Sequence, residues 1–384
     1  MTPRERVRVA LAHREPARVP FSWNFGPTPE MAAVLEAYLA ERGADWVRFR
    51  DAVDDVIQVS PTPLAAGTGS VDVWGIHRAA QSYGAGSYDE IAHHPLAGVT
   101  DPAELDGYPW PDPDAYDYEH FQEDVLAADP EGLRARKLSI RMCGNPFEIY
   151  CWMTGLEEAL VNVLLNPDLV RAALGRIGDV FAGTLRRALS VAGDLIDILY
   201  FADDLGGQQG LLMSRKAYRA VIQPTHARLF RLGKSLAPHA AVMFHTDGAV
   251  YDIVPDLMGA GIDVLEAVQT DAAGMEPGRL KAAYGHRLAF HGGIPVQSLL
   301  PYGDVETVTR ETRRLVAVFG AGGGYIAAPT HAVQVGTPPE NVLAMLRAVL
   351  GDAGFEAAWA ESNKRSTDST DHRQGARSSA VSSP

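Results

Sequence analysis

The sequence predicts a single α/β domain built as a closed (β/α)8 (TIM) barrel. Eight apolar, strand-like segments alternate with helical segments, and this alternation is typical of a parallel sheet. Eight such units within about 340 residues favour a closed barrel over an open, doubly wound sheet, which is the alternative. No G-x-G-x-x-G or P-loop motif stands at a strand–helix junction, and this counts against a nucleotide-binding fold.

The N-terminal part begins with a helical extension. Thr2, Pro3 and Glu5 form a helix-start pattern in which Thr2 is the N-cap and Glu5 closes a capping box, so a helix is expected to about residue 13. The first strand is expected at 18–24, followed by a helix at 29–42 and a strand at 55–59. The proline-rich, aromatic segment 95–118 is expected to run over the surface.

The remaining chain follows a regular alternation. Further strands are expected at 137–142, 195–201, 240–244, 262–268, 287–290 and 325–331. Helices are expected at 155–165, 167–192, 214–236, 276–284 and 304–319, with one that ends at 260 and a last one that starts at 338. Residues 1–358 are therefore assigned to the barrel, and the Ser-rich, polar residues 359–384 to a disordered tail.

Composition excludes several classes of function. The formal charge of −14 and the pI near 5.3 argue against nucleic acid or an anionic membrane as a partner. No apolar run approaches the roughly 20 residues that span a bilayer, and the first residues lack the apolar core of a signal peptide. Two cysteines, Cys143 and Cys151, form neither a disulfide framework nor a C-x-x-C metal site. We therefore expect a cytoplasmic protein with a small-molecule substrate.

The sequence His245-Thr246-Asp247-Gly248 closes the apolar run at 240–244. Side chains alternate along a strand, so His245 and Asp247 are expected to point to the same side. This pair suits a divalent metal or a proton-transfer site. The structural alternative is a histidine at a strand end and an aspartate that caps the next helix.

Other expected strand ends also carry polar residues. In a TIM barrel, functional groups lie at the carboxyl ends of the strands. Each residue alone is more often a cap or turn residue, but their convergence predicts an active site at that face of the barrel. The residues are Asn24, Asp54, Asp55, Asn145, Glu148, Asp203, Asp204, Gln269, His291 and His331.

These motifs resemble the uroporphyrinogen decarboxylase superfamily over roughly residues 2–350. This superfamily includes the decarboxylases and the zinc-dependent cobamide methyltransferases, and it implies a TIM barrel. The resemblance rests on the order and spacing of several short motifs. They are Thr2-Pro3-Arg4-Glu5-Arg6-Val7, Arg18-Val19-Pro20, Tyr108-Pro109-Trp110-Pro111-Asp112-Pro113, Gly144-Asn145-Pro146-Phe147, Asp203-Asp204-Leu205-Gly206, His245-Thr246-Asp247-Gly248, Gly323-Gly324-Tyr325, His331 and Pro338-Pro339-Glu340-Asn341.

The decarboxylase branch is matched in part. Its members carry two arginines just after the first strand, whereas residues 21–28 here contain none. The active-site tyrosine of that branch corresponds to Trp152. The aspartate that organises the substrate corresponds to Asp55, and the late active-site histidine to His331. An octa-anionic porphyrinogen is therefore the less favoured substrate.

The methyltransferase branch binds zinc through a His-x-Cys pair and a later cysteine. These ligands fall on His245, Asp247 and His331, which gives a two-histidine, one-carboxylate metal site by resemblance. Zinc is the first choice, and iron or manganese are alternatives. Glu148, Asp203 or Gln269 would complete the shell or act as acid or base. In the alternative without metal, His245 and His331 bind substrate through hydrogen bonds.

By resemblance, the expected reaction is methyl transfer that involves a corrinoid carried by a partner protein, because this chain lacks an Asp-x-His-x-x-Gly corrinoid motif. The competing hypothesis is decarboxylation of a smaller acid, and a third is a non-catalytic binding barrel. A homodimer is compatible with each. In the decarboxylation hypothesis Asp55, Asp203 and Asp204 organise the substrate, while His331 binds it or protonates the carbanion. Asn24, Trp152, Gln269 and His291 are the candidate substrate-binding residues.

Overall fold

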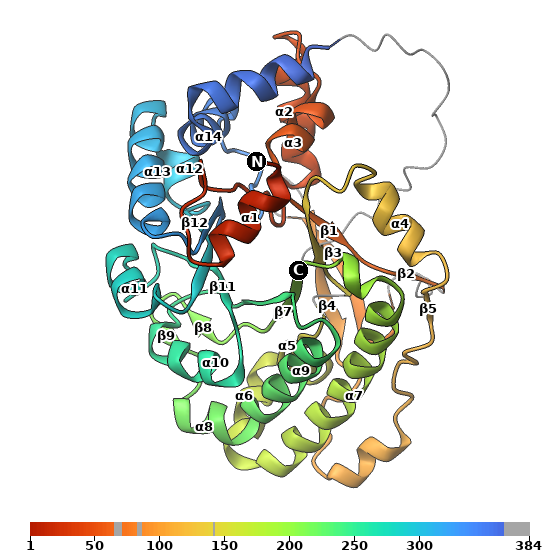
Figure 1. Cartoon of the computed structure of the whole chain (residues 1–384). Coiled ribbons are helices and arrows are strands. Elements are labelled where there is room, and N and C mark those ends of the chain that lie inside the picture. The colour runs from red at the N-terminus through yellow and green to blue at the C-terminus, as the bar shows by residue number, and fades with distance from the viewer. Residues whose placement is uncertain (65–70, 83–86, 141–142, 365–384) are drawn as a thin grey trace.

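The computed structural model describes residues 1–64, 71–82, 87–140 and 143–364. Its centre is a curled parallel sheet of seven strands in the order β1-β6-β7-β10-β11-β12-β13, with helices around the outside (Figure 1). The strands are β1 (Val56–Val59), β6 (Ala135–Leu138), β7 (Ile198–Ala202), β10 (Ala241–His245), β11 (Val264–Ala267), β12 (Ala289–Ile294) and β13 (Tyr325–Pro329). The apolar runs form these strands because both faces of the sheet are covered.

Three small antiparallel pairs accompany the sheet. They are β2 (Thr62–Pro63) with β5 (Tyr116–Asp117), β3 (His77–Ser82) with β4 (Ser87–His93), and β8 (Gly206–Gly207) with β9 (Gly210–Leu211). The α-helices are α1 (Pro3–Leu11), α2 (Pro29–Ala40), α3 (Trp46–Val53), α4 (Phe121–Ala128), α5 (Pro146–Thr154), α6 (Leu156–Leu165), α7 (Pro167–Ala192), α8 (Arg215–Val221), α9 (Gln223–Leu236), α10 (Val254–Ala260), α11 (Pro277–Tyr284), α12 (Leu299–Tyr302), α13 (Val305–Gly320) and α14 (Pro339–Ser362). Short 3-10 helices cover Pro102–Gly107, Gly193–Leu195 and Tyr251–Ile253.

Residues 20–22 connect the two edge strands of the sheet. Phe21 forms a parallel bridge with Ala327 of β13, and Ser22 N donates to Ala327 O (2.9 Å). On the other side, Asp55 N donates to Phe21 O (2.9 Å). The first predicted strand is thus reduced to one bridge residue, and the arrangement is consistent with a TIM-barrel-like fold. The α/β class with a parallel sheet is confirmed.

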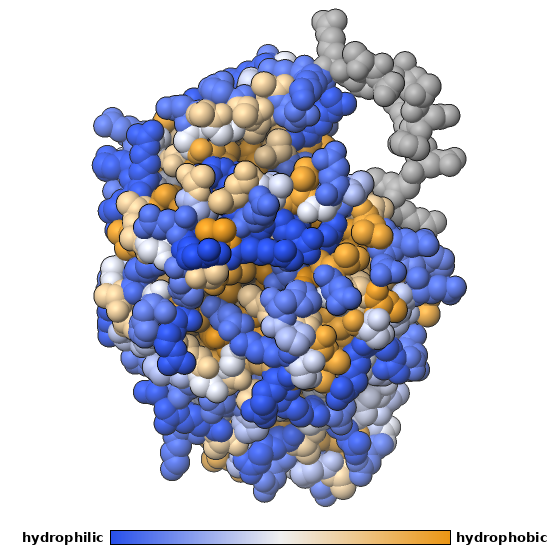
Figure 2. All heavy atoms as spheres, in the orientation of Figure 1, coloured by the Kyte–Doolittle hydropathy of each residue, from blue (hydrophilic) through white to orange (hydrophobic). Residues whose placement is uncertain are grey.

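Helix α1 closes the amino-terminal end of the curled sheet. The predicted capping box is present, with the Thr2 side chain accepting from Glu5 N and the Glu5 side chain accepting from Thr2 N. Val7 of α1 is fully buried among the side chains that fill the inside of the sheet, which include Val56, Ala135 and Ile198. Hydrophilic side chains form a band over α1 on the outer surface (Figure 2). The opposite end of the sheet is therefore the open one.

An aspartate directly precedes three of the seven strands and binds the neighbouring strand or segment before it. Asp55, Asp197 and Asp263 precede β1, β7 and β11. Their carboxylates accept from Phe21 N (2.8 Å), Arg136 N (3.0 Å) and Val242 N (2.8 Å), respectively. Each aspartate also donates its own N–H back to the carbonyl of the same partner residue. These reciprocal bonds clamp neighbouring strands together in pairs at the amino-terminal end.

Basic side chains neutralise these aspartates. Asp55 is 1% exposed and pairs with Arg18 (2.8 Å) and with Arg6 of α1, and Asp197 pairs with Arg4 and Arg8 of the same helix. Asp55 therefore lies at the closed end and its carboxylate is fully engaged. This position corrects the hypothesis that Asp55 organises a substrate: the aspartate begins β1 rather than ending a strand, and its role is structural.

Several elements differ from the expected ones. The helix expected at 214–236 is split into α8 and α9 because Pro224 has no N–H to continue the first helix. Helices α3, α4 and α5 and the β3–β4 pair were not anticipated. Helix α14 continues to Ser362, so the expected domain boundary at 358 falls inside it. The rest of the expected tail, 365–384, lies outside the described residues. Among the described residues, no helix combines the length and apolar composition that a membrane crossing requires.

We predict that Asp55→Ala lowers the free energy of unfolding by about 3 kcal/mol, because it leaves two partly buried arginines and a backbone N–H without their acceptor. Urea denaturation of the variant measures this loss. Asp168→Ala is the control, since Asp168 is 82% exposed in its pair with Arg171, and it should change stability by less than about 1 kcal/mol. An Asp55→Ala protein of unchanged stability that has lost its activity would return Asp55 to the active site.

Candidate functional site

Polar side chains fill the inside of the sheet toward its open end. His245, Glu266 and His291 are register partners on the neighbouring strands β10, β11 and β12. Lys137 of β6 and Tyr200 of β7 are also buried, and the Lys137 ammonium lies 3.8 Å from the centre of the Tyr200 ring. The parallel strands thus bring one carboxylate and two imidazoles into a single row, with an ammonium nearby.

Glu266 is the centre of this network. Its carboxylate accepts hydrogen bonds from His245 Nδ1 (2.6 Å), from the Tyr200 hydroxyl (3.0 Å) and, in a short contact, from Asn24 Nδ2. Lys137 Nζ donates to Asn24 Oδ1 (3.0 Å). Burial opposes the charge of Glu266, but the charge of His245 and its hydrogen bond hold the pKa of Glu266 well below its usual range. Glu266 is therefore a buried, ionised acceptor.

His245 presents its second nitrogen to two carboxylates. Nε2 lies 3.7 Å from Asp204 Oδ1 and 3.8 Å from Asp247 Oδ1. Burial lowers the pKa of His245, but the charge and hydrogen bond of Glu266, together with Asp247 and Asp204, raise it to about 10. Because Nδ1 is committed to Glu266, Nε2 is the atom that can bind an ion. A carboxylate that fixes a histidine in this way is a common support of metal ligands.

Asp204, His245 and Asp247 fit around one metal ion. One ligand atom from each lies within 4.8 Å of the others. Asp247 Oδ1 is buried and has no hydrogen-bond partner in the part of the chain that the structure describes, and burial is the largest cause that raises the pKa of Asp247 to about 7. Together with Glu266, three carboxylates face the imidazole of His245, and a divalent cation would balance this excess of negative charge. The residues therefore fit a divalent ion.

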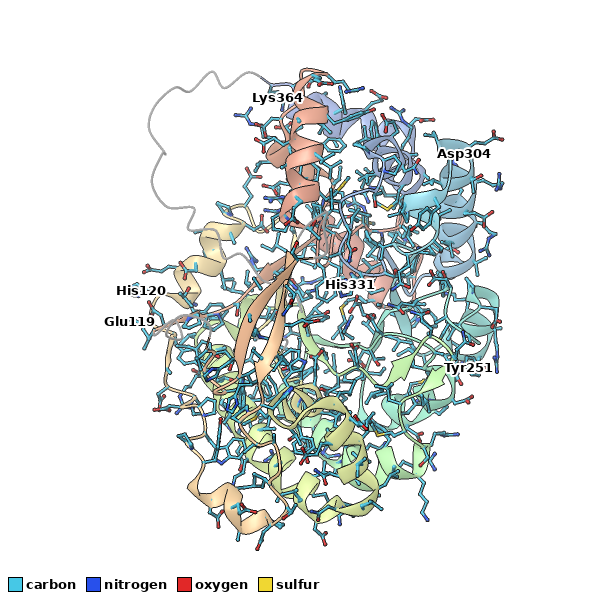
Figure 3. All side chains as sticks on the ribbon, turned by 180° about the vertical axis from the view of Figure 1, so that it is seen from behind. Glu119, His120, Tyr251, Asp304, His331 and Lys364 are labelled. Atoms are coloured by element: carbon cyan, nitrogen blue, oxygen red, sulfur yellow. The ribbon has the colours of Figure 1, made fainter. Side chains whose placement is uncertain are left out.

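His331 is not part of this three-residue group. Its ring centre lies 6.5 Å from that of His245, and Phe25 stacks on it with ring centres 4.6 Å apart. Seen from behind, His331 lies near the middle of the molecule, on the side opposite α1 (Figure 3). The structure thus places His331 near His245 at the open end, while Asp204 joins His245 and Asp247 in the group whose ligand atoms lie within reach of one ion.

Asp203 and Glu148 have different surroundings: Asp203 binds the first turn of α5, whereas Glu148 lies beside the metal-binding cluster. Asp203 is fully buried, and its carboxylate accepts from Phe147 N (3.0 Å), Glu148 N (2.6 Å) and His226 Nε2 (2.6 Å). It therefore anchors the start of α5. Glu148, on that first turn, accepts from Asn145 Nδ2 (2.7 Å). Burial and then the charge of Asp204 raise the pKa of Glu148 to about 8, so it holds a proton at neutral pH beside the cluster.

The remaining candidates have varied surroundings. Gln269 Oε1 accepts from Gly248 N (3.0 Å) and so orders the turn after Asp247. His291 is fully buried, and among the described residues neither ring nitrogen has a hydrogen-bond partner; Nδ1 lies 3.8 Å from Glu266 Oε1. Burial lowers the pKa of His291, which favours the neutral ring. Trp152 packs under the guanidinium of Arg78 on β3 (4.8 Å). The structure therefore links Gln269 and His291 to the cluster and Trp152 to the β3–β4 pair.

Sequence reasoning missed Glu266, Lys137 and Tyr200. A signal was present, because Glu266 stands in the run Val264-Leu265-Glu266-Ala267 and Lys137 stands in another strand. Strands that are buried on both faces are nearly continuous in apolar residues, so a charge within one must have a partner. The identity of that partner depends on strand register, which the sequence alone does not define.

Comparisons with known proteins agree with this architecture. The family model described as "Uroporphyrinogen decarboxylase (URO-D)" matches residues 99–351. A uroporphyrinogen decarboxylase of Aromatoleum aromaticum is 22% identical over 249 residues, which are 62% of this chain and 65% of that protein. One of Methylibium petroleiphilum is 26% identical over 267 residues, 67% of this chain and 68% of that protein. The matched part thus spans about two thirds of these relatives.

A solved structure supports the fold over nearly the whole chain. A methyltransferase from Methanosarcina mazei superposes with a TM-score of 0.61 at 16% identity, covering 91% of this chain and 98% of that one. At this identity the likeness concerns the fold alone. The family model, in contrast, matches more than half of the 384 residues. This chain therefore belongs to the uroporphyrinogen decarboxylase (URO-D) family.

Proposed function

We propose that this protein is an enzyme that transfers a methyl group between a corrinoid carried by a partner protein and a small acceptor molecule. The transfer would take place at a divalent metal held by Asp204, His245 and Asp247. The observation that carries the proposal is the orientation of His245, whose Nδ1 is bound to Glu266 while Nε2 faces two carboxylates. An imidazole with two carboxylates suits zinc, iron or manganese, and zinc is our first choice by resemblance to the methyltransferase branch.

The residues around the metal position have distinct tasks. A divalent ion bound there would supply Lewis acidity that lowers the pKa of an acceptor thiol or hydroxyl. Glu266 keeps the His245 ring oriented, and its negative charge offsets the positive charge of the ion that His245 would bind. Glu148 holds a proton at neutral pH and is able to donate it, or a hydrogen bond, to a substrate atom near Asp204. His331 and Phe25 form one side of the space in front of His245.

Decarboxylation of a small acid is the second candidate. The family model favours it, and Lys137 supplies a buried ammonium that would attract a carboxylate. Uroporphyrinogen remains the less favoured substrate, because residues 21–28 contain no arginine or lysine to hold its carboxylates. A hydrogen bond to a charged group contributes about 1.5–3 kcal/mol, and several would be missing.

We predict that His245→Ala and Asp204→Asn lose bound zinc, because each removes one of three ligands, whereas His331→Ala keeps it within about threefold of the wild type. Zinc titration of the metal-free proteins, with elemental analysis of the loaded ones, measures this. The control is Asp271→Asn, an exposed acidic residue outside the cluster. Loss of zinc in His331→Ala with retention in Asp204→Asn would instead favour the ligand set expected from sequence.

Glu266→Gln should weaken zinc binding by about 10–100-fold, because it removes the charge that supports the His245 ligand. The pKa of His245, followed by NMR in the metal-free protein, should fall from about 10 toward its ordinary value. The second readout separates a role in positioning His245 from general loss of structure. The surface variant Glu276→Gln serves as the matched control, and an unchanged pKa of His245 in Glu266→Gln would contradict the assignment.

With zinc loaded, the protein should demethylate methylcobalamin, or a methylated corrinoid protein, when it is offered a thiol acceptor. Absorbance of the corrinoid reports the reaction. Asp247→Ala should reduce the rate at least about 100-fold, a loss of about 2.7 kcal/mol of transition-state stabilisation. Uroporphyrinogen should not be turned over at the same enzyme concentration. Formation of coproporphyrinogen at an enzyme-like rate would overturn the proposal, and the absence of both reactions would leave decarboxylation of a smaller acid as the leading function.

A further inference from the structure

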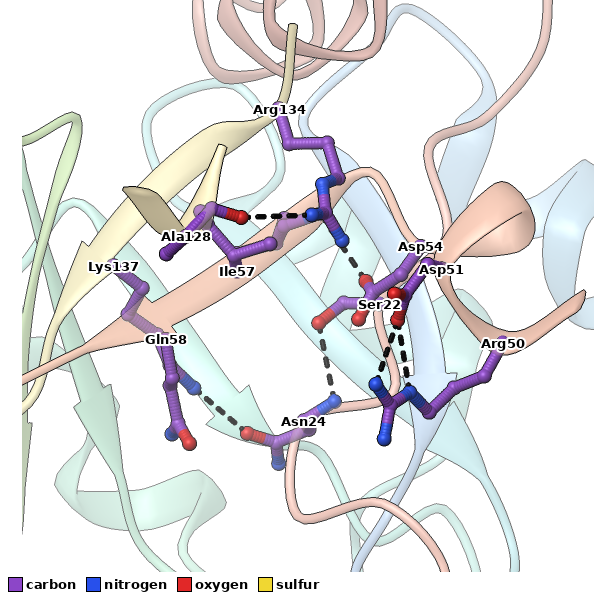
Figure 4. Close-up of a pocket in the computed structure, with 11 residues that line it drawn as sticks. Ser22, Asn24, Arg50, Asp51, Asp54, Ile57, Gln58, Ala128, Arg134 and Lys137 are labelled. Atoms are coloured by element: carbon purple, nitrogen blue, oxygen red, sulfur yellow. Dashed lines mark hydrogen bonds and ion pairs between the residues drawn. The ribbon is translucent and has the colours of Figure 1, made fainter. Parts of the chain in front are cut away.

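A polar cavity of about 440 Å³ is lined by Ser22, Asn24 and residues of β1, and Asn24 also donates to Glu266. Its lining includes Asn24, Arg50, Asp54, Gln58, Arg134 and Lys137 (Figure 4). The gap exists because residues 20–22 and β1 are joined through Phe21 and Asp55 only near the start of β1. The partly exposed Arg50 and Arg134 and the buried Lys137 therefore line one cavity.

The ammonium group of Lys137 has more N–H donors than it uses within the described residues. An ammonium group carries three N–H bonds, and within the described residues Lys137 donates one hydrogen bond, to the neutral Asn24 Oδ1 (3.0 Å), while its charge lies over the Tyr200 ring. The residue is only 1% exposed. Burying an ammonium that makes no direct ion pair is costly, and burial lowers the pKa of Lys137 to about 8, although the charges of Glu266 and Asp54 act in the opposite direction. An anion in the cavity would complete the coordination of this group.

The charge of the lining suits one carboxylate. Arg50, Arg134 and Lys137 stand against Asp51 and Asp54, an excess of one positive charge in a chain whose formal charge is −14. Arg50 is paired with Asp51 (2.8 Å), and Arg134 donates to Ala128 O (3.1 Å) and faces Asp54 (Figure 4). The two arginines are thus balanced by the two aspartates, and the surplus positive charge of the lining belongs to Lys137.

We propose that this cavity binds the carboxylate of a small organic acid, with Lys137 as its buried anchor and Arg134 at its outer part. This site requires no metal and does not depend on the proposed methyl transfer. Gln58 and the Asn24 amide supply additional hydrogen-bonding groups for the rest of the molecule. Because Asn24 also donates to Glu266, the bound acid would lie one side chain away from the network that orients His245.

Butyrate and its uncharged analogue butyramide test the site directly. Ligand-observed NMR titration of the metal-free protein should show butyrate binding at least about tenfold more tightly than butyramide. Lys137→Met keeps the length of the side chain and removes its charge, so it should abolish this preference. Arg134→Gln should weaken butyrate binding about three- to tenfold. Arg231→Gln, an exposed residue on α9, should bind butyrate as the wild type does.

Two further results decide the assignment. Butyrate binding should persist in His245→Ala, because the cavity is separate from the metal cluster; loss of binding in that variant would place the carboxylate at the cluster and overturn the proposal. Equal binding of butyrate and butyramide by the wild type would also overturn it. Circular dichroism establishes whether Lys137→Met is folded, and if it is not, an unchanged affinity in Arg134→Gln counts against the site. Because no metal is used, the result stands whether or not methyl transfer is found.

Discussion

The buried carboxylate of Glu266 is the constraint on which the candidate site depends. An ionised carboxylate without partners inside a protein is very costly, and here three donors from three separate segments meet it: Asn24, Tyr200 and His245. Each donor thereby links its own segment to β11. The orientation of the His245 ring, and thus the direction of its free nitrogen, follows from satisfying one buried charge.

The two ends of the sheet differ in how completely their charged and polar side chains are paired. At the closed end, the carboxylates of Asp55 and Asp197 are each occupied by two arginines and by a backbone N–H. At the open end, Asp247 Oδ1 and both nitrogens of His291 have no hydrogen-bond partner within the described residues, and Glu148 retains a proton. The candidate site thus lies where titratable side chains are incompletely matched.

Much of the fold was predictable because its signals are local. The strand predicted from the apolar run at 195–201 corresponds to β7 (Ile198–Ala202), and the helix predicted at 304–319 corresponds to α13 (Val305–Gly320). The site was predictable in part, since His245 and Asp247 emerged from spacing alone. Asp55 was misplaced because a polar residue before a strand and one after it look alike in sequence. The role of Glu266 required strand register, and that of Asp204 required the distance to His245; neither is encoded within one local segment.

The clamps formed by Asp55, Asp197 and Asp263 have a consequence for how the chain tolerates extra sequence. They tie the segment 20–22 to β1, β6 to β7 and β10 to β11, and leave the joints between these pairs unclamped. The long connection from residue 60 to 134, with its β3–β4 pair and α4, lies at such a joint, between β1 and β6. The wall of the sheet is thus a set of two-strand modules, and a segment added at a seam between them would break no clamp.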